Sequence, residues 1–200
     1  PKQPYDPVKQ FTHVSMLGIA PVLIMANPKS GPASLKDLPK FMGQTGTFGS
    51  GGPGSIGHIV GEMIKHEMKF GMTHIPYKGG VTAIQDTVAG QTQILMNGML
   101  ATLPQVQNGK LKVLGVSKST RMPLIGDVPT IAEQGVAGYE SGTWQGVLVP
   151  RGTPEAVVQK LNKALITAIR APEIRSRLAG QGAEVVTMTP AEQDQFFTKE

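Results

Sequence analysis

A glycine-rich stretch ahead of a helical pattern is the part of the sequence best suited to chemistry. Residues 46–67 read GTFGSGGPGSIGHIVGEMIKHE, with glycines, a proline and two serines before the apolar periodicity begins. A glycine-rich turn that opens a helix leaves backbone N–H groups pointing outward at the positive end of the helix dipole. That arrangement binds an anion without a charged side chain, and Ser50 and Ser55 add hydroxyl donors. The alternative is a tight strand-to-helix connection that binds nothing.

A second stretch repeats this arrangement. In PYKGGVTAIQDTVAG, residues 76–90, Gly79 and Gly80 precede another helix start, with Tyr77 and Lys78 beside them. Two helix N-termini from successive strand–helix units can face one ligand at one edge of a sheet. Lys78 taken alone is better explained as a solvated surface lysine.

Nucleotide motifs fit the first stretch poorly. Gly49–Gly54 formally matches G-x-G-x-x-G, but no acidic residue lies between Glu67 and Asp86 to hold a ribose. The preceding GQTGTF is also a poor candidate for a buried first strand. A P-loop needs a lysine and a hydroxyl where this chain has Ser55-Ile56. An α/β enzyme that binds a nucleotide at Gly49–Gly54 therefore stays only as an alternative.

Other catalytic groups are not evident in the sequence. His58, Glu62 and His66 are spaced by four residues, but each such step turns about 40° around a helix, so the three predict a solvated face rather than a metal site. His58 differs because it lies in the first turn, close to the expected anion site. The chain has no cysteine, which excludes disulfides and thiol chemistry. We expect no enzyme activity, no metal and no cofactor.

The elements that position these residues alternate between strands and helices. Strands are expected at 21–26, 72–77, 93–96, 112–116 and 146–150, with a turn at PQVQNGK between the third and fourth. Two helices are expected from apolar spacing, one from Ile56, Ile59, Val60, Met63 and Ile64 and one from Val81, Ile84 and Val88. Two more are expected from capping boxes at Thr130 and Thr189, and the last of these helices is expected to run to the final residue. The strongest helix is expected to open at Thr153 as N-cap, to be bounded by Pro172, and to bury Val157, Val158, Leu161, Ala164, Leu165, Ala168 and Ile169. This alternation favours an α/β fold with a largely parallel sheet.

Composition limits the possible partners. The 200 residues carry a net charge of +5 and a pI near 9.5, but the basic residues are scattered and only 5% of residues are aromatic, so nucleic acid is not expected. No apolar run approaches the roughly 18 residues of a membrane span. The first residues lack the charged-then-apolar pattern of a secretory leader, so the chain as given is not expected to be a secretory precursor.

Several long motifs resemble one known family. They are YDPVKQFTHVSMLG, GSGGPGSIGHIVGEM, HIPYKGGVTAIQDTVAGQ, GKLKVLGVSKSTRMPLIGDVPTIAEQG and WQGVLVPRGTPEAVVQKLNKAL. Their order and spacing are similar to those of Bug-type solute receptors, the extracytoplasmic substrate-binding proteins of tripartite tricarboxylate transporters. The resemblance covers almost the whole chain.

This resemblance implies a two-lobed periplasmic-binding-protein-like fold of the Venus-flytrap type II class, located in the periplasm. It implies capture of a small organic acid and its delivery to membrane permease subunits. On the family pattern, lobe 2 spans residues 25–146 and lobe 1 keeps 1–24 and 147–200. The implied ligand contacts lie in the two glycine loops: Ser50, Gly51, Gly54, Ser55, Tyr77, Lys78, Gly79 and Gly80.

The chain departs from the family pattern at its ends. The first strand and a glycine–aspartate loop of lobe 1 are absent, as is about one helix at the far end, and LKDLPKFMGQTGTF is shorter than usual. Lobe 1 is therefore expected to be incomplete, leaving at most half a cleft. A receptor remnant that binds no ligand is the third alternative.

Overall fold

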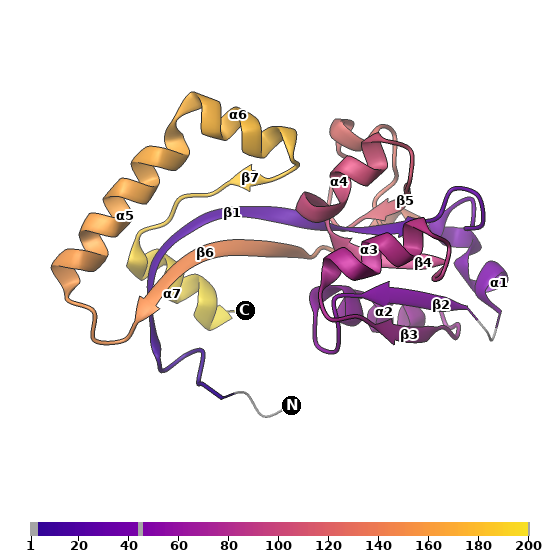
Figure 1. Cartoon of the computed structure of the whole chain (residues 1–200), viewed down its shortest axis with the longest axis horizontal. Coiled ribbons are helices and arrows are strands. Elements are labelled where there is room, and N and C mark those ends of the chain that lie inside the picture. Colours follow the sequence, from indigo (N-terminus) through magenta and orange to yellow (C-terminus); the bar gives the residue numbers. More distant parts are fainter. Residues whose placement is uncertain (1–3, 44–45, 200) are drawn as a thin grey trace. The chain divides into compact units, whose positions relative to one another are not determined.

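The computed structural model describes residues 4–43 and 46–199, which form two compact units. Unit 2 is continuous, from Ala20 to Thr143, whereas unit 1 combines residues 1–19 with 144–200. The strand β1 (Phe11–Ala26) contributes residues to both units (Figure 1). The lobe boundaries expected at 24/25 and 146/147 stay a prediction.

Unit 2 is built on a mixed sheet. Its strands are ordered β3-β2-β4-β1-β5, where β2 is Thr47–Ser50, β3 is Thr73–Pro76, β4 is Ile94–Gly98 and β5 is Lys112–Val116. β2 runs parallel to both β3 and β4, but β1 runs antiparallel to β4 and β5. The expected largely parallel sheet is therefore only partly correct, because β2, β3, β4 and β5 run in one direction but β1 runs against them.

Helices cover both faces of this sheet. Alternate residues of β1 point to opposite faces, so Val22, Ile24 and Ala26 pack in one core while Leu23 and Met25 pack in another. The first core lies against η1 (Leu35–Asp37), α1 (Leu38–Met42) and α2 (Ile56–Glu67), and the second against α3 (Gly80–Val88) and α4 (Met99–Gln107). Unit 2 is thus a three-layer α/β structure.

The sheet-facing side of α2 differs from the expected apolar stripe. Gly57, Val60, Gly61 and Ile64 are buried, whereas Ile59 and Met63 are 48% and 45% exposed. A Cβ at Gly61 would lie 2.2 Å from the Phe48 ring. The helix therefore packs closer to the sheet than any side chain at position 61 would allow. The glycines, which carry no hydropathy signal, define the buried face.

Two other expectations are corrected in unit 2. The predicted turn at PQVQNGK is mostly the end of α4, which has Pro104 in its interior and is held by the buried Met99 and Leu103. The GQTGTF segment does contribute a buried strand, since Phe48 is fully buried in β2 between β3 and β4. Part of this segment, residues 44–45, lies outside the described residues.

The remaining elements of unit 2 are short. η2 spans Pro123–Ile125, and η3 spans Ala132–Gln134 and ends at Gly135. The capping box expected at Thr130 is confirmed: the Glu133 carboxylate accepts from the Thr130 N–H at 2.7 Å, and the Thr130 hydroxyl accepts from the Glu133 N–H at 3.1 Å.

Asn27 connects the end of β1 to the end of α3. Its Nδ2 donates to the carbonyls of Thr87 and Val88, at 3.1 and 3.0 Å. We expect Asn27→Ala to lower the free energy of unfolding by about 1–3 kcal/mol, because the buried carbonyls lose their donor. Chemical denaturation measures the change. The control Asn108→Ala, at an exposed position after α4, should change stability by less than about 0.5 kcal/mol; equal effects would contradict the assignment.

Unit 1 combines the first part of β1 with β6 (Gly142–Pro150) and β7 (Glu184–Val185), both of which pair with β1. Its helices are α5 (Glu155–Arg170), α6 (Pro172–Gly180) and α7 (Pro190–Lys199). Within unit 1, Trp144 packs edge-on against Phe197, with ring centroids 4.4 Å apart. The capping box at Thr189 is confirmed, and the expected continuation of α7 to Glu200 lies outside the described residues.

The start of α5 and its buried face differ from expectation. Thr153 does not cap the helix, because its hydroxyl donates to the Pro150 carbonyl at 2.8 Å, and Pro154 is the N-cap residue. Val158, Asn162 and Ile169 are buried, whereas Val157 and Leu161 are 45% and 38% exposed. About half of the predicted apolar face is therefore in contact with solvent.

Candidate functional site

Three strand–helix units end at one edge of the unit 2 sheet. β2 pairs in parallel with both β3 and β4, so all three strands run in the same direction. Their carboxyl ends therefore lie together, and they lead into α2, α3 and α4. The loops after β2 and β3 are the two glycine-rich stretches singled out from the sequence. We call residues 50–55 the first glycine loop and residues 77–80 the second glycine loop.

The two glycine loops are hydrogen bonded to each other. The Tyr77 N–H donates to the Ser50 carbonyl and the Gly79 N–H to the Gly51 carbonyl, both at 3.2 Å. Gly52 has a φ of +120°, and a Cβ on it would lie 2.8 Å from the Tyr77 carbonyl oxygen. Only glycine therefore permits this contact between the loops.

Backbone donors remain available at the helix starts. Helices leave their first N–H groups without an intrahelical acceptor. Within the described part of the chain, no acceptor is hydrogen bonded to the N–H groups of Ile56 and Gly57 in α2, or of Gly80 and Val81 in α3. These donors lie at the positive ends of two helix dipoles, which favour a bound anion.

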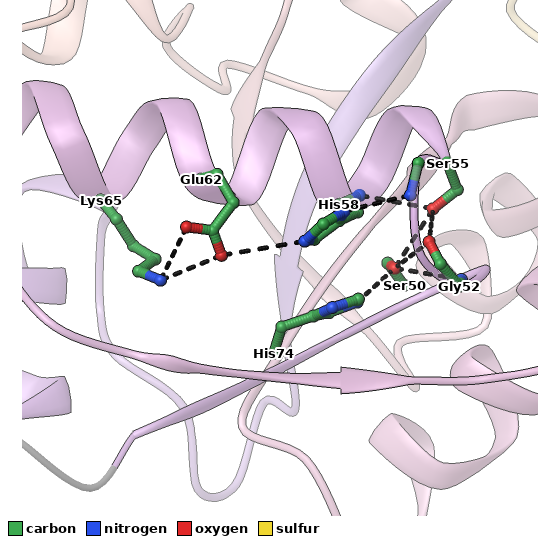
Figure 2. A network of polar contacts seen from close by, with 8 residues as sticks. Ser50, Gly52, Ser55, His58, Glu62, Lys65 and His74 are labelled. Atoms are coloured by element: carbon green, nitrogen blue, oxygen red, sulfur yellow. Dashed lines mark hydrogen bonds and ion pairs between the residues drawn. The ribbon is translucent and has the colours of Figure 1, made fainter. Parts of the chain in front are cut away.

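The serines of the first glycine loop hold the loop itself. Ser50 is fully buried, and its Oγ lies 2.7 Å from Nε2 of His74. The Ser55 hydroxyl donates to the Gly52 carbonyl at 2.7 Å and accepts from the His58 N–H at 3.4 Å, as the N-cap of α2. Figure 2 shows these contacts converging at the helix start. The hydroxyls expected to face a ligand are thus engaged within the loop.

The other predicted site residues are distributed over the same edge. Gly51 is half-buried, while Gly54, Lys78 and Gly79 are exposed. Nδ1 of His58 accepts from the Gly54 N–H at 3.1 Å. Gly80 lies next to Asn97, whose Nδ2 donates to the Gly80 carbonyl at 3.4 Å. The structure therefore brings all the predicted residues to one edge, and their contact with a ligand stays a prediction.

Tyr77 points back into the protein. Its ring packs against the core that contains Ala83, near the backbone of Gly49. Burial, and then a hydrogen bond to the Asp86 carboxylate and its negative charge, raise the pKa of the Tyr77 phenol. Tyr77 therefore stays neutral and fixes the second glycine loop.

Sequence reasoning missed His74, Asn97 and Gly98 at this edge. Gly98 is the N-cap residue of α4, and its N–H donates to Asn97 Oδ1 at 2.8 Å. A strand followed directly by the apolar spacing of Met99, Leu103 and Val106 was the signal for this third strand–helix unit, and Pro104 obscured it. The partner of His74 leaves no local signal, since Ser50 is 24 residues away.

A separate pocket within unit 1 contains none of the predicted site residues. It is lined by Val8, Phe11, His13, Arg151, Asp194, Phe197 and Thr198. Its charged groups hold unit 1 together: His13 Nδ1 contacts the Asp194 carboxylate, and Arg151 Nε donates to the Lys9 carbonyl at 2.7 Å. Among the described residues, no cluster of three or more histidine or acidic side chains has the arrangement of a metal site.

Comparison with known proteins identifies the family. Residues 1–200 match the family TctC, described as "Tripartite tricarboxylate transporter family receptor". The chain belongs to the TctC receptor family. This confirms the resemblance found in the sequence motifs, and it places the chain among receptors rather than enzymes. The nucleotide-binding enzyme considered for Gly49–Gly54 is therefore set aside.

Individual TctC relatives extend this result. BugT of Bordetella pertussis is 29% identical over 203 residues, which cover 100% of this chain and 62% of BugT. A Rhodopseudomonas palustris protein, Rpa4515 with adipate, superposes with a TM-score of 0.93 at 29% identity, over 98% of this chain and 66% of that one. MatC from the same organism, with bound malate, superposes with a TM-score of 0.91 at 31% identity, over 100% of this chain and 70% of MatC.

These TctC-type structures confirm the expected periplasmic-binding-protein-like α/β fold. The chain spans 60% to 62% of the length of the first curated relatives that it matches. No helix in the described part of the chain is both long and apolar enough to cross a membrane.

Proposed function

We propose that this chain belongs to a solute receptor that captures a small organic acid through backbone N–H groups of the two glycine loops. The receptor acts in the periplasm and delivers its ligand to the permease subunits of a tripartite tricarboxylate-type transporter. The predicted site residues are Ser50, Gly51, Gly54, Ser55, His58, Tyr77, Lys78, Gly79 and Gly80. Of these, the glycine and helix-start amides make the main contacts, while Ser50, Ser55, His58 and Tyr77 hold the loops in place.

One observation carries the proposal: two glycine-led helix starts lie against each other at one sheet edge, with N–H donors left over. The 3.2 Å bonds between the loops fix their spacing, and the N–H groups of Ile56, Gly57, Gly80 and Val81 are not used by the described residues. A carboxylate has the charge and the acceptor oxygens that such donors favour. Lys78, exposed beside Gly79, adds a positive charge to the same edge.

The relatives support the ligand class and the location. The Rhodopseudomonas palustris proteins superpose on the chain while carrying adipate and malate, both of them dicarboxylates. The family description links TctC receptors to tripartite transporters, and one similar structure is described as a periplasmic transporter. A small mono- or dicarboxylate is accordingly the ligand to test first.

The test is isothermal titration of the chain with malate, adipate and acetate, combined with ¹H–¹⁵N NMR of the backbone. We expect saturable binding and a rise in melting temperature. The largest amide shifts should fall in residues 51–57 and 79–82. NAD and ATP serve as controls and should give no response.

Two results would contradict the proposal. Carboxylate-induced shifts confined to residues outside the two glycine loops would place the site elsewhere. A cooperatively folded chain that ignores every carboxylate would favour the alternative of a receptor remnant without binding activity.

A further inference from the structure

Two histidines form a stack under the first glycine loop. The rings of His58, in α2, and His74, in β3, have centroids 4.2 Å apart and planes inclined by 18°. His74 also stacks on Phe48, with centroids 4.8 Å apart. Figure 2 shows both imidazoles beside the loop, with His58 next to Ser55 and His74 next to Ser50. We call His58 and His74 the histidine stack.

The contacts of His58 define its protonation state. Its Nδ1 lies 3.1 Å from the backbone nitrogen of Gly54, which always donates. An acceptor Nδ1 carries no proton, so this hydrogen bond requires the uncharged imidazole, with its proton on Nε2. That nitrogen faces Glu62, whose Oε1 lies 4.0 Å away. Gly54 is therefore held by an imidazole that must remain uncharged.

The contacts of His74 lead to the same result. The Ser50 hydroxyl has one proton and two lone pairs. Its Oγ accepts from the Gly52 N–H at 3.2 Å. The Ser55 hydroxyl lies 3.2 Å away, but its single proton is directed to the closer Gly52 carbonyl at 2.7 Å. The Ser50 proton is then best placed toward His74 Nε2, at 2.7 Å, rather than toward the Gly52 carbonyl at 3.3 Å. His74 accepts, and is neutral.

We propose that His74 is a positioning residue, which together with His58 holds the first glycine loop in its binding conformation only while both imidazoles are uncharged. Carboxylate affinity therefore falls on acidification. This inference rests on the proposed function of the glycine loops. His74 acts on the ligand through Ser50, and His58 acts through Gly54.

Protonation of either histidine of the stack removes a hydrogen-bond acceptor from the first glycine loop. A proton on His58 Nδ1 would place two donors against each other at Gly54. A proton on His74 Nε2 would oppose the Ser50 hydroxyl proton and displace it from the 2.7 Å contact between these two residues. With ring centroids 4.2 Å apart, a charge on one imidazole disfavours a charge on the other.

The charged groups around the stack come from α2. Burial first, then the charge of His58 and that of Lys65, lower the pKa of His74, while Glu62 acts in the opposite direction. Lys65 holds both Glu62 oxygens, at 2.9 and 2.8 Å, which weakens the effect of Glu62. From β2, the neighbouring side chains are Phe48 and Ser50, which carry no charge. The lowered pKa favours the neutral form of His74.

The direction of the pH effect separates this inference from simple electrostatics. A positive His58 beside an anion site would by itself strengthen carboxylate binding as pH falls. Loss of the Gly54 contact acts the other way, because the loop donors are no longer held in place. We expect the second effect to exceed the first, with binding of malate weakening roughly five- to tenfold from pH 7.5 to pH 5.5, about the worth of one hydrogen bond.

The first experiment needs no ligand. An NMR titration of the chain from pH 7.5 to 5 follows the imidazole resonances and the amides of Gly52 and Gly54. We expect the Gly54 amide shift to follow the His58 imidazole with one midpoint. A Gly54 amide that stays constant while His58 titrates would overturn the inference, whether or not carboxylates bind.

The second experiment measures malate affinity at both pH values in three variants. His74→Phe keeps an aromatic ring in the stack but removes Nε2, and should bind malate more weakly at pH 7.5. His74→Gln offers an uncharged acceptor to Ser50 and should restore most of the affinity. His66→Gln, an exposed histidine of α2, is the control and should behave as the natural chain does.

The outcomes distinguish the two proposals. Stronger malate binding at pH 5.5 than at pH 7.5, or unchanged binding in His74→Phe, would overturn the positioning role. A chain that binds no carboxylate at any pH, but whose Gly54 amide follows His58, would contradict the proposed function and leave the histidine control of the loop in place. If His74→Phe does not fold, His74→Gln and the ligand-free titration still test the positioning role of the histidine stack.

Discussion

Replacing Gly57 by alanine is expected to lower the free energy of unfolding by roughly 3 kcal/mol or more. Gly57 lies in the first turn of α2, and a Cβ on it would be 2.0 Å from the backbone carbonyl oxygen of Met96. Backbone in a central strand cannot move aside as a side chain can. The variant must therefore lift the start of α2 away from β4, and the donors of Ile56 and Gly57 move with it. Chemical denaturation and carboxylate titration measure the two consequences.

The matched control is Gly180→Ala. Gly180 is the last residue of α6, and no atom lies within 4 Å of the position a Cβ would take. Alanine is favoured over glycine in a helix by up to about 1 kcal/mol, so this variant should be neutral or slightly stabilising. If Gly57→Ala matched the control in stability, α2 would not be in direct contact with β4.

Gly52→Ala is expected to affect binding more than stability. Alanine at a φ of +120° is strained by about 1–2 kcal/mol, and its Cβ would lie 2.8 Å from the Tyr77 carbonyl oxygen. Relief of that contact separates the two glycine loops, which disrupts the 3.2 Å bonds between them. We expect malate affinity to fall on the order of tenfold or more, as measured by isothermal titration.

Gly135→Ala separates strain from loop contact. Gly135 has a similar φ of +115°, but no atom lies within 4 Å of a Cβ placed on it. The variant should lose stability through backbone strain alone and retain the affinity of the natural chain. Equal losses of affinity in the two variants would show that general destabilisation, rather than the contact with Tyr77, explains the effect.

Local patterns predicted many of the elements but not all of their limits, since the strand expected at 21–26 is only the last part of β1. The apolar run at Lys112–Val116 is β5, the periodic residues after Ser55 form α2, and Pro76 ends an edge strand. The capping boxes at Thr130 and Thr189 form as expected. These features depend on neighbours within a few residues, so the sequence alone determines them.

Features that depend on tertiary packing were not predictable in this way. The alternation of strands and helices does not encode the direction of β1 against β4. Pro104 argued against α4, because an interior proline costs about 3 kcal/mol, yet burial of Met99 and Leu103 outweighs it. On α5, periodicity identifies an apolar stripe but does not determine how much of it is covered.

The candidate site also combines features that local sequence predicts with features that depend on tertiary packing. The glycine loops were recognisable because their chemistry lies in contiguous residues. The histidine stack was not, since it requires Phe48 and His74 to be neighbours across β2 and β3 and requires α2 to bring His58 over them. Only the register of parallel strands places His74 next to Ser50.

The discontinuity of unit 1 has a consequence for the order of folding. Unit 2 is one uninterrupted segment, so it can fold as soon as that segment is available, whereas unit 1 must join two segments separated by all of unit 2. Closing so long a loop in an unfolded chain has a large entropic cost. Within folded unit 2, however, the Thr143 hydroxyl donates to the Ala20 carbonyl at 3.2 Å, which brings the two connections side by side. We therefore expect unit 2 to fold first and to bring β1 and β6 together for pairing, with unit 1 forming second.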